Sequence, residues 1–263
     1  MRSRGFKAVP SVVITALRST GRPTPTNEVV AMKIRRVSAV AAVMVSVLAP
    51  AGLSAQAEIT ANAGWLSQYY YRGLQQKTSS ANAGLDVAAG TFSAGTWAAD
   101  VGDGAEVDVY GGVGIDLTDM VSLSVGGTGY FYTGEFDDTY LEVNLGAGLG
   151  PISIEWSMGQ WSGTDPKSKY LFVGVTAEHE GLFATVGTAG YNSGFSDAIS
   201  DAFDKDMGYQ YLEAGYGFSA GDLDWVISGI FNDSALSGEV NGDGDPAPEL
   251  TFVLGVSKTF SLN

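Results

Sequence analysis

The sequence predicts an all-β protein, an antiparallel up-and-down transmembrane β-barrel of about 12 strands. Three observations support this fold class. Segments of about ten residues alternate apolar with small or polar residues, which is the period of a β-strand. The links between these segments alternate between tight turns and longer loops. Glycine accounts for 36 of the 263 residues and aromatic residues for 11%, whereas only 16% of the residues are charged.

The first part of the chain is predicted to be a targeting segment. From Met32 it reads "MKIRRVSAVAAVMVSVLAPAGLSAQA": a basic start, an apolar run over 37–48 and a final A-x-A. The apolar run is too short to span a bilayer as a helix, and the three features together are typical of a secretory signal peptide. We therefore predict an over-extended start over 1–31, a signal peptide over 32–57 and a mature outer-membrane barrel over 58–263.

Removing the predicted leader makes the chain strongly acidic. Residues 1–57 hold eight of the 14 Lys and Arg residues but only one of the 29 acids. The mature chain therefore carries 6 basic and 28 acidic residues, a net charge of about −22. This balance excludes nucleic-acid binding, which needs a basic surface. The predicted partners are instead outer-membrane lipid and lipopolysaccharide, and the barrel assembly machinery during biogenesis.

Twelve segments after Glu58 show the two-residue alternation. In "AEVDVYGGVGIDL", for example, Val107 and Val109 fall on one face, and Glu106 and Asp108 on the other. No helical period of any length is present. The predicted strands are 59–72, 80–89, 91–101, 105–117, 120–133, 138–149, 151–161, 168–179, 182–192, 208–219, 222–232 and 249–261.

The links between the predicted strands alternate in length. Those after even-numbered strands are minimal: Gly90, Thr118-Asp119, Gly150, Glu180-Gly181 and Ala220-Gly221. Those after odd-numbered strands are longer, except for a short link near Gly102-Asp103-Gly104: they are 73–79, 134–137, 162–167, 193–207 and 233–248. Short periplasmic turns and longer external loops are typical of an outer-membrane barrel with both termini in the periplasm.

Alternation by itself also fits a soluble β-sandwich. The segments are longer than the usual five or six residues of soluble strands, which favours membrane-spanning strands. Aromatic residues also cluster near segment ends, as in the girdles at a membrane surface. These predicted girdle residues are Trp65, Tyr69, Tyr71, Tyr130, Phe131, Tyr132, Trp156, Trp161, Tyr170, Phe172, Tyr209 and Tyr211.

The alternation also predicts which side chains line the lumen. The candidates are Arg72, Asp86, Glu106, Asp108, Tyr110, Glu142, Glu155 and Glu213, together with Tyr70. In "QYYYRGLQQ", Tyr69 and Tyr71 share a strand face with Trp65 and are predicted to face lipid. Gly73 is predicted to begin the first external loop. An acidic lumen fits a narrow, cation-preferring pore. It equally fits a closed barrel in which these groups satisfy one another and long loops 193–207 and 233–248 bind a partner.

Three stretches of the mature chain resemble the Gcw_chp family of proteobacterial proteins. They are "WLSQYYYRGLQQ", "LDVAAGTFSAGTWAADV" and "AEVDVYGGVGIDL". The family reads roughly S-x-Y-x-x-R-G, then G-x-Y-x-G-x-W, then E-x-D-x-Y-x-G, and Thr91-Phe92 departs from its common Gly-Tyr-like pair. The matching residues are Ser67, Tyr69, Arg72, Gly73, Phe92, Gly95, Trp97, Glu106, Asp108, Tyr110 and Gly112. The resemblance, which extends to the closing "GVSKTF", implies an outer-membrane-like protein of unknown function.

Little in the sequence indicates catalysis or a cofactor. There is no cysteine, and the one histidine, His179, lies at a predicted turn between Glu178 and Glu180. We therefore expect no enzyme and no cofactor.

Two acidic stretches, 196–206 and 241–249, have oxygen ligands suited to calcium, and Asp243, Asp245 and Glu249 are weak candidates in the second. Neither has EF-hand spacing, and the alternative is a solvated acidic loop. Phe260 is a candidate for the C-terminal aromatic residue recognised during barrel assembly.

Overall fold

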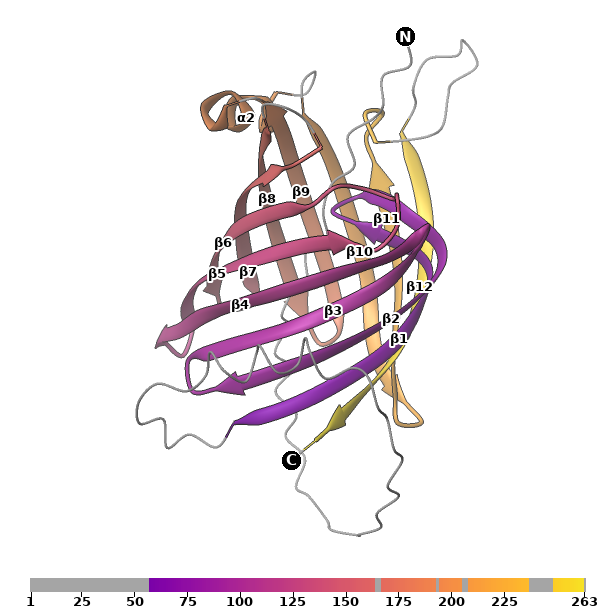
Figure 1. The fold of residues 1–263 in the computed structure, drawn as a ribbon. Coiled ribbons are helices and arrows are strands. Elements are labelled where there is room, and N and C mark those ends of the chain that lie inside the picture. The colour runs from indigo at the N-terminus through magenta and orange to yellow at the C-terminus, as the bar shows by residue number, and fades with distance from the viewer. Residues whose placement is uncertain (1–56, 164–166, 193, 205–207, 237–247, 263) are drawn as a thin grey trace. The chain divides into compact units, whose positions relative to one another are not determined.

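The computed structural model describes residues 57–262 except 164–166, 193, 205–207 and 237–247. The predicted leader, apart from Ala57, lies outside the described residues. Twelve antiparallel strands follow one another around a closed barrel, and β1 pairs with β12 to complete the ring (Figure 1). The predicted fold class is confirmed. The strands are β1 Glu58–Tyr71, β2 Leu74–Ala89, β3 Phe92–Gly102, β4 Gly104–Thr118, β5 Val121–Tyr132, β6 Tyr140–Leu149, β7 Ile152–Trp161, β8 Ser168–His179, β9 Leu182–Asn192, β10 Tyr209–Ala220, β11 Leu223–Asn232 and β12 Glu249–Ser261.

The two ends of the barrel differ in the length of their links, as predicted. At the end that holds both Glu58 and Ser261, all five links are two-residue turns. We call this the short-turn end. Positive φ angles at Glu180 (49°) and Gly181 (86°) show why such turns fit here, because two positive φ values match the twist of paired strands. At the opposite, long-loop end, the links 133–139, 162–167, 193–208 and 233–248 are longer, and Asp103 alone joins β3 to β4.

The first link at the long-loop end differs from the prediction. Residues 73–79 were expected to form an external loop, but β2 begins at Leu74 and runs for 16 residues. Only Arg72 and Gly73 separate β1 from β2. The prediction was wrong because the polar run "QQKTSS" was interpreted as loop, whereas it is strand that pairs with β1.

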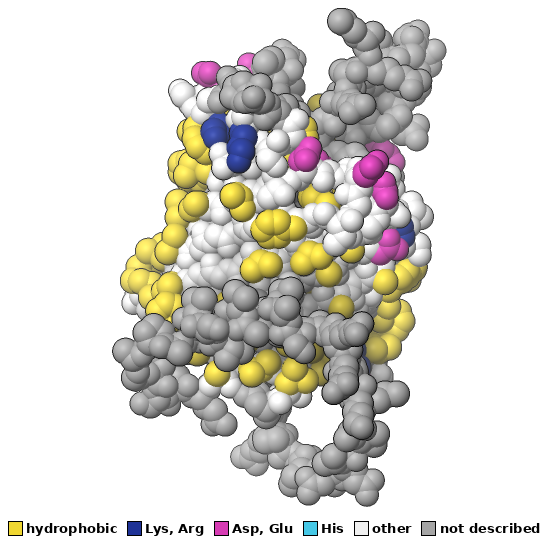
Figure 2. Space-filling model, in the orientation of Figure 1, with side chains coloured by type: hydrophobic (Ala, Val, Ile, Leu, Met, Phe, Trp, Pro, Cys, Tyr) yellow, Lys and Arg dark blue, Asp and Glu magenta, His cyan; other side chains and the backbone are white. Residues whose placement is uncertain are grey.

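The barrel is apolar outside and polar inside. Large hydrophobic side chains are exposed at alternate positions around the wall, and Figure 2 shows them as yellow patches over the visible face. The opposite faces of the same strands carry the polar groups described below. These exposed residues include Leu123, Val125, Leu141, Val143, Leu145, Ile152, Ile154, Val175, Val186, Leu212, Ile227 and Phe252.

One short helix, α2 (Phe195–Ala202), lies in the link between β9 and β10. It was not predicted: residues 196–202 of the acidic stretch 196–206 are helix rather than loop, and 205 and 206 lie outside the described residues. Its eight residues are too few to show a clear helical period, and Asp201 faces the barrel, where Asn192 Nδ2 donates to its Oδ2 at 3.1 Å. Within the described residues, no helix has the length and hydrophobicity to cross a bilayer.

Candidate functional site: a barrel interior crossed by the first hairpin

The hairpin of β1 and β2 leaves the barrel wall near its middle. β1 pairs with β12 only over Thr60–Leu66, and β2 pairs with β3 only over Asn82–Ala89. Residues 67–81 therefore have strand partners only within the hairpin itself. In Figure 1 the indigo ends of β1 and β2 turn back from the edge of the wall across the barrel. A Cβ built on Gly73 would lie 2.7 Å from the Cβ of Tyr211 on β10, so the hairpin tip reaches a distant strand.

The tip is a tight two-residue turn. Tyr71 pairs with Leu74 across it, and the φ angles of Arg72 and Gly73 are +44° and +83°. These two positive values fit a type I′ turn, which usually takes Asn or Gly at its first central position. Arginine in the left-handed region costs on the order of 1 kcal/mol. The contacts of its side chain offset this cost.

Arg72 forms a buried ion-pair triad with two carboxylates of the wall. Its Nη1 donates to Glu142 Oε2 at 2.9 Å and its Nη2 to Glu142 Oε1 at 3.0 Å, a two-pronged contact with β6. Nη2 also donates to Glu155 Oε1 on β7 at 2.5 Å. The guanidinium lies 4.0 Å from the centre of the Phe172 ring, and the side chains of Arg72 and Glu142 are 2% and 0% exposed. Such paired, desolvated contacts are strong when every member is satisfied.

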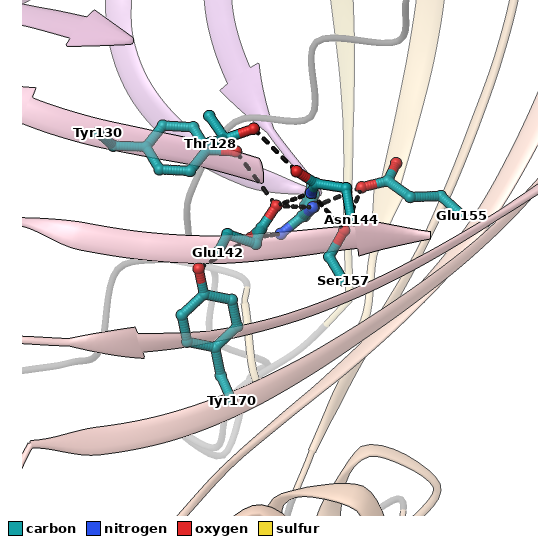
Figure 3. Close-up of polar contacts among 8 residues, drawn as sticks. Thr128, Tyr130, Glu142, Asn144, Glu155, Ser157 and Tyr170 are labelled. Atoms are coloured by element: carbon teal, nitrogen blue, oxygen red, sulfur yellow. Dashed lines mark hydrogen bonds and ion pairs between the residues drawn. The ribbon is translucent and has the colours of Figure 1, made fainter. Parts of the chain in front are cut away.

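Glu142 is held by neutral donors as well. Tyr130 and Tyr170 donate to its two oxygens at 3.3 and 2.8 Å, and Figure 3 shows both rings pointing at this carboxylate. Asn144 also donates to Glu142 and, at 2.9 Å, to Ser157, which donates to Glu155 at 2.8 Å. The two carboxylates therefore belong to one hydrogen-bonded network over β5 to β8.

Aromatic rings fill the interior around this network. Tyr69 and Tyr71 are 3% and 2% exposed and pack with rings from β3, β5, β6 and β8. The predicted lipid-facing position of these two tyrosines is therefore wrong. Trp65, Phe131 and Trp156 do lie on the outer face, but the other predicted girdle residues line or fill the interior. Those that are buried are Tyr69, Tyr71, Tyr130, Tyr170, Phe172, Tyr209 and Tyr211, while Tyr132 and Trp161 are partly buried against them.

The error at Tyr69 and Tyr71 has a structural cause. The alternation rule assigns opposite strand faces to opposite sides of the wall, but this hairpin has left the wall. Both of its faces then lie inside the barrel, where Tyr69 donates to Glu106 at 2.7 Å and Tyr70 to Thr251 at 3.1 Å. A run of three tyrosines without polar alternation is the one sequence signal of this arrangement.

The remaining predicted lumen residues also lie inside. Tyr110 donates to Asp86 at 2.5 Å, and Asn62 donates to the same carboxylate at 3.3 Å. Glu213 lies half-buried on the inner face of β10, two residues from Tyr211. Asp108 is fully buried beside Glu106 on β4, and neither of its side-chain oxygens has a hydrogen-bond partner among the described residues. The structure thus brings Arg72, Glu142 and Glu155 into direct contact, and leaves Asp86, Asp108 and Glu213 outside that triad.

Asp108→Asn is expected to raise the free energy of unfolding by about 1–3 kcal/mol, because burying an unpartnered carboxylate costs more than burying an amide. Urea unfolding of the detergent-solubilised barrel, followed by tryptophan fluorescence, measures this change. Asp86→Asn is the matched control, because Asp86 accepts two hydrogen bonds and should gain nothing. A loss of stability in Asp108→Asn contradicts the prediction.

The interior near the short-turn end is lined by small side chains. Glycines and serines replace the tyrosines there: Gly112, Gly114, Ser122, Ser124, Gly126, Gly146, Gly148, Ser153, Gly215 and Gly217. A cavity of about 290 Å³ extends from Asp224 on β11 to Trp97 on β3, whose ring packs against Tyr69 at 5.5 Å. The cavity therefore ends against the aromatic layer that surrounds the hairpin. Its lining residues are Leu66, Asn82, Trp97, Asp224, Trp225, Val226, Gly255, Val256 and Ser257.

Of the three weak metal candidates, the structure describes only Glu249. Glu249 begins β12 and accepts a hydrogen bond from Thr251 at 3.0 Å, while Asp243 and Asp245 lie outside the described residues. Among the residues that the structure describes, no three acidic or histidine side chains are grouped as metal ligands. His179 is exposed at the last position of β8, beside the two-residue turn, as expected.

Comparison with known proteins gives a family. A model of the Gcw_chp family, described as a bacterial protein of unknown function, matches residues 50–226. The chain belongs to the Gcw_chp family. The predicted resemblance is thereby confirmed, and the match contains every residue of the Arg72, Glu142 and Glu155 triad. No curated protein matches this Gcw_chp chain in sequence.

Several solved structures share the barrel type of fold with this Gcw_chp protein. OprD from Pseudomonas aeruginosa is 13% identical, with a TM-score of 0.37, over 79% of this chain and 67% of OprD. The NanC porin is 12% identical, with a TM-score of 0.45, over 76% and 98%. OccAB2 from Acinetobacter baumannii is 10% identical, with a TM-score of 0.36, over 77% and 60%. The matched region thus spans about two thirds of the length of the OprD-type chains.

Proposed function

We propose that this Gcw_chp protein is a porin-like channel of the bacterial outer membrane that its own first hairpin closes. The observation that carries the proposal is the course of residues 67–81, which leave the wall and place Arg72 against Glu142 on β6. A strand that only forms the wall would stay paired with its neighbours along its length. A hairpin that crosses the lumen instead can obstruct a passage through the barrel. The small-residue lining and the cavity near the short-turn end would form the vestibule of that passage.

The outer face supports the membrane location. An outward apolar surface and a polar interior are the arrangement that a bilayer requires of a closed barrel. By the usual orientation of such barrels, the short-turn end lies in the periplasm and the long-loop end outside the cell. The hairpin then closes the external half of the lumen.

The charges of the interior support a preference for cations. The inward carboxylates include those of Asp86, Glu106, Asp108, Glu142, Glu155 and Glu213, and they accompany the guanidinium of Arg72. Rings of carboxylates attract cations and repel anions at the short range of a narrow pore. An open state is therefore expected to pass small cations in preference to anions.

Planar-bilayer recording tests this proposal. The wild-type protein, shown to be folded by heat-modifiable migration on gels, should stay mostly closed with rare cation-selective steps. Glu106→Gln should reduce the cation selectivity of those steps, because it removes one inward charge while keeping an acceptor for Tyr69.

Asp100→Asn is the matched control, because Asp100 pairs with Lys77 away from the carboxylate network and should leave selectivity unchanged. A folded protein that never conducts, even when the hairpin is released, contradicts the channel. That result would favour the closed barrel that binds a partner through loops 193–207 and 233–248.

A further inference from the structure

Helix α2 packs on the outer face of the barrel at the long-loop end. Its Ala198 and Ala202 lie against Gly190 of β9, where an added Cβ would overlap the backbone of the helix. Leu171, which points outward from β8, is completely buried there. Thr188 on the same outer face donates a hydrogen bond to the carbonyl of Ala202. The helix is therefore fixed to the side of the wall that faces lipid (Figure 1).

A second apolar surface of α2 lies beside its buried face. Phe195, Ile199 and Phe203, spaced four residues apart, are 42%, 37% and 64% exposed. Residues at this spacing share one helix face. Below them, the exposed Val175 of β8 and Val186 of β9 continue the apolar outer surface of the barrel. The helix face thus extends the lipid-facing belt toward the external rim.

Positive charge lies at the same place. Lys169 on β8 points outward, with its Nζ 5.6 Å from the centre of the Phe195 ring and 2.7 Å from Gln160 Oε1. Lys167 is exposed two residues earlier. These are two of the 6 Lys and Arg residues in a mature chain with 28 acids, and Lys169 lies beside the apolar face of α2, although α2 itself carries Asp197 and Asp201.

We propose that α2, Lys167 and Lys169 form a binding site for one lipopolysaccharide molecule of the outer leaflet. The apolar face of Phe195, Ile199 and Phe203 would contact acyl chains, and the two lysines would contact the lipid A phosphates. The position at the external end of the lipid-facing belt, and the pairing of cations with an apolar face, favour this occupant over a second barrel. The proposal rests on the outer-membrane location given above, but not on conduction.

Native mass spectrometry of the detergent-solubilised full-length barrel tests the site with lipopolysaccharide and with its dephosphorylated form. The wild type should retain one lipopolysaccharide, and removal of the phosphates should weaken the complex. Lys169→Gln should weaken phosphate-dependent binding about fivefold, the effect of one lysine at an anionic lipid surface. Asp197→Asn should strengthen it, because Asp197 is an exposed acid on α2 that opposes an anionic ligand.

Lys258→Gln is the matched control. Lys258 also lies over an aromatic ring, 5.8 Å from the centre of Phe260, but it is on β12 near the short-turn end. Its replacement should not change binding. Equal loss in Lys169→Gln and Lys258→Gln, or binding that ignores the phosphates, overturns the site. A dimer that forms without lipopolysaccharide and is lost in Phe203→Ser also overturns it, in favour of a second copy. Conductance is measured separately, so a closed barrel that binds lipopolysaccharide contradicts only the channel.

Discussion

Arg72→Ala is expected to convert a mostly closed barrel into a frequently open one, with at least a tenfold rise in open probability in planar bilayers. Arg72 makes three hydrogen bonds to Glu142 and Glu155 and also lies against Phe172. Each charge-assisted hydrogen bond contributes about 1.5–3 kcal/mol, and a tenfold change in the equilibrium needs only about 1.4 kcal/mol. Loss of the guanidinium also makes the interior more acidic, so the open state should become more cation-selective.

Lys77→Ala is the control for this prediction. It removes one positive charge from the same hairpin, but Lys77 pairs with Asp100, which is 47% exposed, and has no part in the triad. Open probability should therefore stay at the wild-type value. Because Arg72→Ala leaves Glu142 buried without its cation, the double variant Arg72→Ala/Glu142→Gln is recorded as well and should also open. If both variants fold but remain closed, Arg72 does not hold a gate.

The second large effect is expected on stability. Glu142→Gln should lower the free energy of unfolding by about 3 kcal/mol, because it removes the two-pronged partner of the buried guanidinium and leaves Arg72 with Glu155 alone. Glu142 is the common acceptor for Arg72, Tyr130, Tyr170 and Asn144, so no other interior carboxylate has as many described donors. Urea unfolding in detergent, with cold and heated gel migration as a second readout, measures the loss.

A double-mutant cycle separates the ion pair from packing. Arg72→Met/Glu142→Gln should be more stable than the sum of the two single variants predicts, since the buried charges are removed together. The matched surface variant Asp100→Asn breaks the exposed pair with Lys77 and should change stability far less. Additive effects at Arg72 and Glu142 would show that the two residues do not interact energetically in the folded barrel.

The two-residue alternation of apolar and polar residues predicted most of the strands that form the barrel wall. Alternation in "AEVDVYGGVGIDL" placed Glu106 and Asp108 inside and Val107 and Val109 outside, and the two-residue turns were visible as glycines and polar pairs. These features depend on local geometry, because a strand shows opposite faces to its two sides wherever it runs. The inward positions of Asp86, Glu142, Glu155 and Glu213 followed from the same rule.

The course of the first hairpin and the contacts of its arginine depend on the folded barrel. Tyr69, Tyr71 and Arg72 could be assigned to strand faces from sequence, but a face has no meaning for lipid or lumen once the strand leaves the wall. The contact between Arg72 and Glu142 joins residues 70 positions apart. It depends on barrel closure, which brings β6 opposite the tip of β1. Local alternation is therefore enough to specify a membrane-type barrel with an acidic interior, whereas the position of the first turn inside that barrel follows from closure of the ring.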